Sequence, residues 1–310
     1  MTDAVRREAR EAFVGALDAH DRVLVTGAGG WFGSTVAALL QGSGHPTLFL
    51  TQRPRAVSIG SSTTVDAVAW DADGIRAFAP TVVIDCAFIL RDYIDDASLE
   101  HYVHENTVLT GRLLQLMALD SVRRVVSVSS GAAVHPVDAS ATEVAANPYG
   151  YLKRQAELAV QQRGAELGVT TVIARPFSVS GSLVSRPERY AFSNLILQAR
   201  TGRAVIQSAR PVWRRYVGAD DFFAVALLGS RRGSFVLESG GELLEFGELA
   251  LRIAAELELP IEVERPPLLG DAGQDDYYST DELWARACAD LGFTPASLGD
   301  QARAVNAYLP

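Results

Sequence analysis

A tyrosine and a lysine on one predicted helix have the types and spacing that acid–base chemistry on a hydroxyl or carbonyl group needs. In the segment NPYGYLKRQAE, Tyr149 precedes Lys153 by four residues, and residues i and i+4 share one face of a helix. The charge of Lys153 is expected to lower the pKa of the Tyr149 phenol, so that Tyr149 exchanges a proton near neutral pH. Such a pair is common by chance and needs support from other segments.

Two serines upstream are suited to the same chemistry. The segment RRVVSVSSGAAVHP predicts a strand over 124–128 that delivers Ser129 and Ser130 at its carboxyl end. A hydroxyl in that place is able to hydrogen-bond the reacting oxygen. Either serine alone is typical of a turn or a helix cap, so the pair is read together with its neighbours in the sequence.

A glycine-rich loop near the N-terminus resembles a phosphate cradle. In VLVTGAGGWFG, Gly27, Gly30 and Gly33 are spaced G-x-x-G-x-x-G between a predicted strand and a predicted helix, and Phe32 stands where the G-x-G-x-x-G fingerprint has its last glycine. The glycines permit a tight bend, close approach to a pyrophosphate and close helix–strand packing. A turn that binds nothing is the alternative. The order of glycine loop, strand with two serines and Tyr-x-x-x-Lys is far more specific than any one motif, and it predicts a dinucleotide site.

The segment after the second predicted strand bears on the choice of dinucleotide. A NAD site often has an acidic residue there, which binds the ribose 2′-hydroxyl, but the sequence reads Thr51-Gln52-Arg53-Pro54-Arg55. Arg53 and Arg55 are able to pair with a 2′-phosphate instead, or they belong to a solvated loop. We therefore expect NADP, with NAD as the alternative.

The elements that must position these residues alternate between strands and helices, which implies a parallel sheet covered by helices on both faces. Strands are expected at 22–26, 47–51, 65–69, 81–86, 123–128, 170–174 and 234–238, and helices at 3–19, 31–41, 97–119, 149–167, 190–201, 219–229, 246–257 and 280–291. The predicted class is α/β, a Rossmann-type doubly wound parallel sheet with a small C-terminal substrate-binding cap. The expected parts are an N-terminal helical extension over 1–20, a dinucleotide-binding domain over 21–177 and a cap over 178–310, from which about 205–235 returns to the first domain.

Composition excludes several classes of function. The formal net charge of −9 over 310 residues argues against a nucleic-acid surface, which needs a basic face. No apolar run reaches the roughly 18 residues that a membrane span needs, and the charged start MTDAVRREAREAF is not a secretory signal. The two cysteines and five histidines are scattered, so no metal site is expected. A cytoplasmic location is the default.

From residue 22 onward the chain resembles the extended short-chain dehydrogenases/reductases of the nucleotide-sugar epimerase, dehydratase and reductase group. TGAGGWFG resembles their glycine loop, VIDCAF a cofactor-lining strand, ARPFSVSG the segment where nicotinamide and substrate meet, and RRYVGADDFF their R-x-Y-x-x-x-x-D segment. The resemblance implies a homodimer, hydride transfer with Tyr149 exchanging the proton, and a cofactor held by Gly27, Gly30, Trp31, Phe32, Gly33, Arg53, Arg55, Asp71, Ala87, Asn106, Tyr149, Lys153 and Pro176.

The expected substrate side lies in the predicted cap. Its first part is rich in arginine, whose planar guanidinium is able to donate two hydrogen bonds to a phosphate. The expected ligand is therefore a nucleoside diphosphate. The family pattern implies that Arg214 binds the diphosphate of a nucleotide sugar. The residues expected to contact substrate are Ser178, Tyr190, Phe192, Asn194 and Arg214. The family's usual asparagine is replaced by Ser178, and Gly218 stands where a histidine is common.

The choice among reactions rests on few residues. Related dehydratases have an acidic pair after the catalytic hydroxyl, whereas Ser130 is followed by Gly-Ala-Ala, which disfavours elimination. The missing acidic residue near Arg53 favours NADPH-dependent reduction of a 4-keto sugar nucleotide. An NAD-dependent nucleotide-sugar 4-epimerase is the alternative. A reductase of non-sugar carbonyls and a non-catalytic dinucleotide-binding protein are further alternatives.

Overall fold

The protein is described by a computed structural model that covers residues 4–90, 98–134, 147–269 and 273–310. A six-stranded sheet forms its centre, in the order β12-β7-β6-β5-β1-β2, and every neighbouring pair is parallel. The expected α/β class with a Rossmann-type parallel sheet is therefore confirmed. The strands are β1 (Val23–Thr26), β2 (Thr47–Phe49), β5 (Val82–Asp85), β6 (Arg124–Val128), β7 (Thr170–Arg175) and β12 (Phe235–Glu238).

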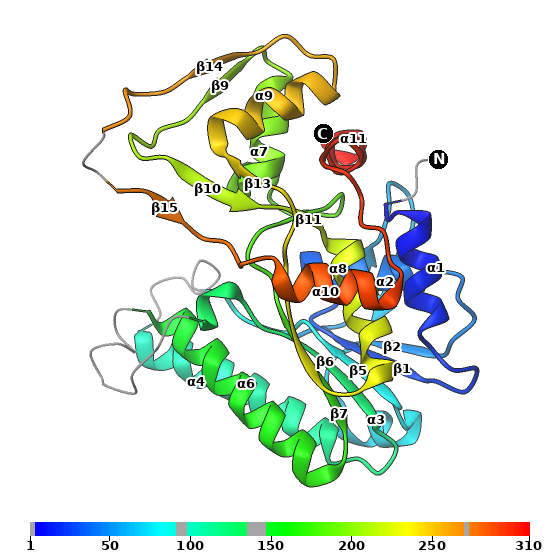
Figure 1. The fold of residues 1–310 in the computed structure, drawn as a ribbon. Coiled ribbons are helices and arrows are strands. Elements are labelled where there is room, and N and C mark those ends of the chain that lie inside the picture. The colour runs from blue at the N-terminus through cyan, green and yellow to red at the C-terminus, as the bar shows by residue number, and fades with distance from the viewer. Residues whose placement is uncertain (1–3, 91–97, 135–146, 270–272) are drawn as a thin grey trace.

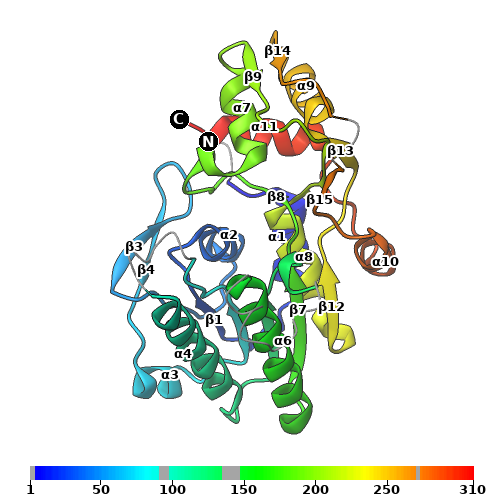
Figure 2. The same cartoon turned by 90° about the vertical axis from the view of Figure 1, so that its left-hand side faces the viewer.

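Helices cover both faces of this sheet (Figures 1 and 2). Consecutive residues of a strand point to opposite faces, and in β1 Val23 and Val25 enter one apolar cluster while Leu24 enters the other. This double burial explains why the strands are apolar throughout. One face packs against α1 (Arg7–Gly15), α2 (Trp31–Leu40) and α8 (Ala219–Gly229), and the other against α3 (Ala72–Phe78), α4 (Leu99–Met117) and α6 (Pro148–Leu167).

One predicted strand lies outside the central sheet. The segment expected to be a strand at 65–69 contains β4 (Thr64–Ala67), which pairs antiparallel with β3 (Arg55–Ser58) in a separate two-stranded sheet. Thr64 and Asp66 are exposed while Ala67 is buried. This alternation is typical of a strand with one solvent-exposed face. Placing the whole of 65–69 in the doubly covered sheet was therefore wrong, although Val68 forms a parallel bridge with Leu50 directly after β2.

The N-terminal helix packs into the core of the sheet domain. Phe13 and Ala9 of α1 are fully buried in the same apolar cluster as residues of α2 and α8. Arg6, just before the helix, donates to Asp221 of α8 over 2.7 Å, and Asp221 is itself fully buried. The N-terminal segment is thus joined to residues more than 200 positions away.

The C-terminal part forms a cap beyond the carboxyl ends of the sheet strands (Figure 1). Its own apolar cluster gathers Phe192, Ile196, Leu249, Ile253 and Val305. The cap consists of α7 (Ala191–Ala199), α9 (Phe246–Glu256), α11 (Leu298–Tyr308), β9 (Arg203–Val205), β10 (Val212–Arg215), β13 (Leu243–Glu245), β14 (Glu262–Glu264) and β15 (Asp275–Asp276).

Two further features connect the cap with the sheet domain. The short strands β8 (Val179–Ser180) and β11 (Val217–Gly218) pair in parallel where the chain enters the cap and where it returns. The helix α10 (Glu282–Leu291) leaves the cap and packs beside α8, where the rings of Trp284 and Phe222 stack with centroids 6.1 Å apart. The cap is therefore connected to the sheet domain by the β8–β11 pair and by the contact between α10 and α8.

Candidate active site

The glycine loop has the geometry of a dinucleotide cradle. Gly27 has a φ of 62°, in the left-handed region that favours glycine, and a Cβ there would lie 2.7 Å from the carbonyl carbon of Cys86. A Cβ on Gly33 would lie 2.6 Å from the Cα of Ala28, so this glycine lets α2 approach β1 closely. Gly30 is the N-cap of α2 and leaves the first N–H groups of the helix available to an anion. These residues fit the pyrophosphate of a dinucleotide.

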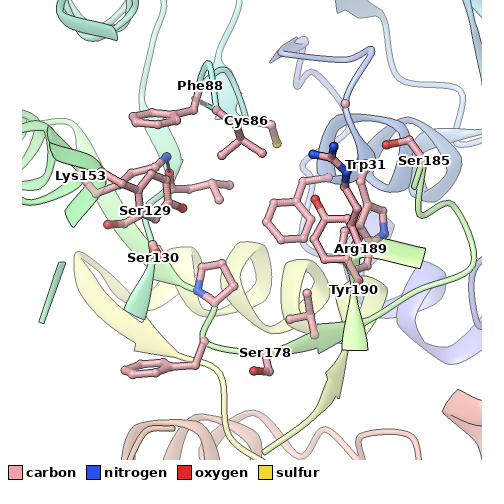
Figure 3. Close-up of a pocket in the computed structure, with 18 of the residues that line it drawn as sticks. Trp31, Cys86, Phe88, Ser129, Ser130, Lys153, Ser178, Ser185, Arg189 and Tyr190 are labelled. Carbon is pink, nitrogen blue, oxygen red and sulfur yellow. Dashed lines mark hydrogen bonds between the residues drawn. The ribbon is translucent and has the colours of Figure 1, made fainter. Parts of the chain in front are cut away.

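A cavity of about 890 Å³ extends from this loop to the cap. Figure 3 shows its two walls: Phe88, Ser129, Ser130 and Lys153 lie on one side, and Trp31, Arg189 and Tyr190 on the other. The rings of Trp31 and Tyr190 meet edge to face with centroids 4.8 Å apart. Tyr149 and Arg214 also line the cavity. The predicted acid–base residues and the arginine predicted to bind a diphosphate therefore line the same cavity.

Ser129 and Ser130 both line this cavity, and Ser130 is the one whose hydroxyl lies next to that of Tyr277. Ser130 follows β6 and caps a short 3₁₀ turn, where its Oγ accepts from the backbone N–H of Ala132 over 3.2 Å. Its Oγ also lies 3.2 Å from the hydroxyl of Tyr277. A hydrogen bond with Ser130 lowers the pKa of Tyr149. Ser130 is therefore placed to orient an oxygen next to the phenol.

Ser129 also lines the cavity, but its hydroxyl is engaged in a buried network. Its hydroxyl donates to Oε1 of Glu157 over 2.5 Å. Both Glu157 oxygens also accept from Arg175, each over 2.7 Å, and Arg175 donates to Glu238 over 3.0 Å. The arginine holds the pKa of Glu157 below its ordinary value although burial opposes this. Ser129 thus joins the ends of β6, β7 and β12 to α6.

Lys153 is fully enclosed and its charge is only partly compensated. Its Nζ donates to the carbonyl of Val128 over 2.8 Å and lies 4.0 Å from the ring centroid of Phe88. Burial lowers the pKa of Lys153 to about 8, against the attraction of Asp85. The lysine is therefore charged at neutral pH and loses its charge at mildly alkaline pH.

The phenol of Tyr149 does not have the lowered pKa that the sequence led us to expect. Burial raises its pKa to about 12 and outweighs the hydrogen bond with Ser130. Its ring stands edge to face against Phe88, with centroids 5.3 Å apart. The expectation that Lys153 brings this phenol near neutrality is wrong for the protein without a bound cofactor, because desolvation is the largest effect.

A second cavity of about 380 Å³ lies beside β1, β2 and α4. Ala87 lines it, together with Gln52 and Trp70, which the sequence had not indicated, and the contact of Ala87 with the cofactor stays a prediction. The guanidinium of Arg112 lies 5.4 Å from the Trp70 ring. The apolar walls and the aromatic ring suit a purine base.

Two predicted cofactor residues are used by the protein itself in this region. Asp71 caps α3 and accepts from the backbone N–H groups of Asp73 and Gly74 over 3.2 and 3.1 Å. Asn106 is buried and bonds both the N–H and the carbonyl of Ile89, over 2.9 and 3.1 Å. Asn106 therefore holds the segment that lines both cavities. A direct contact of either residue with the cofactor stays a prediction.

The two candidate arginines for a 2′-phosphate differ in position. Arg55 donates to the carbonyl of Gly29 in the glycine loop over 2.9 Å and lines a cavity of about 630 Å³ with Gly29 and Gly30. The Arg53 side chain is exposed and is absent from the lining of the three cavities described here. Of these two arginines, only Arg55 bonds the glycine loop.

The cap brings most of the predicted substrate residues to the large cavity. Ser178, Tyr190, Phe192 and Arg214 line it, as does the predicted cofactor residue Pro176, whereas Asn194 does not. Arg214 already bonds the carbonyl and the carboxylate of Asp275 over 2.8 and 2.9 Å. The aromatic lining residues Phe88, Phe177, Phe246 and Tyr277 were not predicted, because no residue pattern in the sequence singles out their side chains.

Two kinds of feature are absent from the described parts of the chain. No group of three or more His, Cys, Asp or Glu side chains there is arranged to hold a metal ion. In the same residues no helix has the length and the apolar character that crossing a membrane requires.

Comparisons with known proteins agree with this architecture. The curated UDP-glucose 4-epimerase of Azospirillum brasilense is 31% identical over 185 residues, which are 53% of this chain and 51% of that protein, so the match spans about half of the relative's length. The UDP-N-acetylglucosamine 4-epimerase of Methanobrevibacter ruminantium M1, solved with UDP-N-acetylmuramic acid, superposes with a TM-score of 0.71 at 18% identity, covering 93% of this chain and 98% of that one.

A second solved structure, the UDP-glucose 4-epimerase of Stenotrophomonas maltophila with bound NAD and formylated UDP-arabinopyranose, gives a TM-score of 0.70 at 20% identity and the same coverage. The model of the NAD-dependent epimerase/dehydratase family matches residues 23–234, from β1 almost to β12. With the glycine loop, Ser130, Tyr149 and Lys153 in one cavity, the match shows that this chain belongs to the NAD-dependent epimerase/dehydratase family.

Proposed function

We propose that this protein is a nucleotide-sugar 4-epimerase that uses a bound NAD, with a uridine diphosphate sugar as the first substrate to test. The observation that carries the proposal is the common cavity of Ser130, Tyr149 and Lys153 with the glycine loop at one end and Arg214 at the other. A dinucleotide and a diphosphate-linked sugar need such an elongated site with phosphate-binding groups at two places. The cavity volume of about 890 Å³ lies in the upper part of the usual range for ligand pockets.

The residues of this chain have distinct roles in the proposed reaction. Tyr149 takes the proton from the sugar C4 hydroxyl and later returns it to the oxygen. Ser130 donates a hydrogen bond to that oxygen and holds it next to the phenol. The charge of Lys153 favours the phenolate of Tyr149. When bound, NAD⁺ supplies the hydride acceptor and a further positive charge, which acts in the same direction as Lys153 and against the effect of burial.

The names of the related proteins support epimerisation over net reduction, and the residues after Ser130 argue against elimination. The curated relative and both solved structures described above are named 4-epimerases. Ser130 is followed by Gly131, Ala132 and Ala133, so no carboxylate comes directly after the serine to drive elimination. An epimerase needs hydride to leave and return within one closed site, and the 4-keto intermediate must turn its other face to the cofactor in between. The cavity between the glycine loop and the cap gives room for such a rotation.

A second candidate is the NADPH-dependent reduction of a 4-keto sugar nucleotide. Two residues support this reaction. Arg55 donates to the carbonyl of Gly29 in the glycine loop, where a 2′-phosphate would be within its reach. Gln52 stands after β2 at the place where a carboxylate would favour NAD. The same Ser130, Tyr149 and Lys153 would then act on a carbonyl that arrives already oxidised.

The test separates the two reactions by their redox balance. The purified protein is incubated with NAD⁺ and UDP-glucose, and the products are separated by chromatography. Conversion to UDP-galactose without net formation of NADH supports the epimerase. No conversion, together with stoichiometric oxidation of NADPH by a 4-keto sugar nucleotide, would establish the reductase instead. Oxidation of NADPH only by carbonyls without a diphosphate would indicate a non-sugar reductase, and cofactor binding without turnover a non-catalytic protein.

We also propose that the protein is a homodimer whose contact involves α4 and α6. The two helices lie side by side on one face of the sheet (Figure 2). On this pair Val108, Leu158 and Leu167 are exposed apolar side chains, with Leu158 45% exposed. Light scattering coupled to gel filtration gives the mass, and a monomer at micromolar concentration would contradict the proposal.

A further inference from the structure

Tyr277 is a second phenol beside the predicted catalytic serine, and it comes from the cap. It directly follows β15, and its hydroxyl lies 3.2 Å from the Oγ of Ser130, 147 residues earlier in the chain. Its ring packs against that of Phe177 with centroids 5.2 Å apart, and it lines the large cavity. Burial raises the pKa of Tyr277, so this phenol remains protonated at neutral pH.

The hydrogen bonds around Ser130 have only one arrangement that serves a phenolate at Tyr149. A serine hydroxyl has one hydrogen and two lone pairs. The N–H of Ala132 donates to one lone pair of Ser130, and in the contact between Ser130 and Tyr277 either hydroxyl is able to donate. Tyr277 therefore has its own hydrogen available for the second lone pair of Ser130. The hydrogen of Ser130 then remains for Tyr149, with which Ser130 forms a hydrogen bond.

We propose that Tyr277 is a positioning residue that fixes Ser130 as a hydrogen-bond donor toward Tyr149 and the reacting oxygen. Without the Tyr277 hydroxyl, Ser130 keeps a free lone pair and is able to accept from the Tyr149 phenol, which favours the protonated phenol. The role rests on the proposed function insofar as Tyr149 is the acid–base group. It predicts that the cap contributes to the proton step as well as to substrate binding.

Arg214 holds Tyr277 in this place. It donates to the carbonyl and to the carboxylate of Asp275, two residues before Tyr277, and its guanidinium lies 5.7 Å from the Tyr277 ring. The residue expected to bind the substrate diphosphate thus also supports the segment that carries the second phenol. Binding of substrate to Arg214 is therefore expected to influence whether Ser130 donates its hydrogen bond, through Asp275 and Tyr277.

The experiment removes one hydroxyl and measures the ionisation of Tyr149. Tyr277→Phe keeps the ring on Phe177 and removes only the donor. Tyr278→Phe is the matched control, because the Tyr278 ring lies over Arg215, 5.8 Å from its guanidinium, and the residue is absent from the lining of the large cavity. Ultraviolet difference absorbance follows phenolate formation without substrate, with saturating NAD⁺ to favour the phenolate. Subtracting a matched Tyr149→Phe protein isolates the signal of Tyr149 from the other eight tyrosines of the nine in the chain.

We expect Tyr277→Phe to raise the pKa of Tyr149 by about one unit, a tenfold change in its ionisation, and Tyr278→Phe to leave it unchanged. At a pH below that pKa, kcat falls about tenfold by the same conversion, whereas KM stays nearly constant. In a Ser130→Ala background, Tyr277→Phe has no additional effect on the pKa or on kcat, because it acts through Ser130. A residue with a merely structural role would still have its own effect in the Ser130→Ala background.

Two results would overturn the proposal. One is an unchanged Tyr149 pKa in Tyr277→Phe, and the other is an effect of equal size in the Ser130→Ala background. If the protein turns over no nucleotide sugar, the proposed function fails, but the substrate-free titration still decides the role of Tyr277. Circular dichroism melting of each variant identifies any protein that is merely unfolded. If Tyr277→Phe is unfolded, Ser130→Ala is compared with the wild type, and an unchanged pKa of Tyr149 in Ser130→Ala would overturn the proposal, because Tyr277 acts through Ser130.

Discussion

The hydroxyl of Ser129 donates to the carboxylate of Glu157 over 2.5 Å, whereas the hydroxyl of the adjacent Ser130 lies 3.2 Å from that of Tyr277. Two neighbouring serines of one motif therefore face different environments. The first stabilises the contact of α6 with the ends of the sheet strands, and the second is available to a ligand. The sequence offered both as catalytic residues, and the geometry distinguishes them.

Substitution of the two serines should separate stability from catalysis. We expect Ser130→Ala to lower kcat by about 10²–10³-fold, as loss of one oxyanion donor does, with a melting temperature close to that of the wild type. Ser129→Ala should lower the free energy of unfolding by about 1–3 kcal/mol, because a buried carboxylate loses a donor, with a much smaller change in kcat. Steady-state kinetics and urea unfolding of both variants check this. The reverse pattern would assign catalysis to Ser129.

The buried lysine predicts an alkaline limit to the reaction. Burial lowers the pKa of Lys153 to about 8, and only the charged ammonium favours the phenolate of Tyr149. We expect kcat to fall as the pH rises through about 8, and Lys153→Met to be strongly impaired at every pH. A pH series of initial rates provides the measurement. A wild-type rate that stays constant well above this pH would contradict the role given to the lysine charge.

The arginines after β2 predict a difference in cofactor preference between two variants. Arg55 contacts the glycine loop, and Arg53 lies away from the described cavities. If NADPH is the tighter ligand, Arg55→Gln should weaken it about tenfold, or about 1.4 kcal/mol, and should leave NADH nearly unchanged. Arg53→Gln is the control and should change neither. Fluorescence titrations give all four constants. Equal or tighter binding of NADH by the wild type would remove the phosphate role of Arg55 and strengthen the epimerase proposal.

The buried ion pair at the N-terminus predicts a pH-dependent stability. Burial raises the pKa of Asp221 to about 6, although Arg6 opposes this, so folding favours the protonated acid and stability falls as the pH rises toward and through 6. Arg6→Met removes the counter-charge and raises that pKa further. We expect a loss of about 3 kcal/mol at pH 8 and a clearly smaller loss at pH 5, where Asp221 holds a proton.

The matched control for this effect is Arg7→Met. Arg7 is 78% exposed and pairs with Glu8 and Glu11, so its removal should change stability by less than about 1 kcal/mol at either pH. Denaturant unfolding at the two pH values measures both variants. An equal loss for Arg6→Met at pH 5 and pH 8 would show that its packing, rather than its charge, matters.

Elements with a strong local signal could be predicted from the sequence. β1, β5, β6 and β7 are runs of apolar and β-branched residues, as strands buried on both faces must be, and Tyr149 and Lys153 lie on α6 as their spacing requires. The segment 65–69 was misplaced because a short apolar run does not reveal whether its partner is a sheet or a hairpin. α3 and α11 were missed, since their apolar faces are narrow and their caps, Asp71 and Ser297, are ordinary loop residues in sequence.

The site could be predicted only where one segment carries the chemistry. Ser130, Tyr149 and Lys153 belong to motifs that are short in sequence, but Tyr277 reaches Ser130 across 147 residues and has no motif around it. The pKa of Tyr149 was predicted in the wrong direction, because spacing shows a charged neighbour and does not show burial. Asp71 was assigned to the cofactor by resemblance, and its cap role follows from the start of α3.

The position of β12 at the edge of the sheet has a consequence for how the chain is made. β7 is covered on one side by β12, and α8 brings the buried rings of Phe222 and Phe223 to the sheet. A nascent chain that has emerged only to residue 177 has β7 as an open edge and an uncovered apolar face. The sheet domain is therefore incomplete until β12 has been made. Until then the growing chain exposes an open strand edge and apolar surface, which favour aggregation.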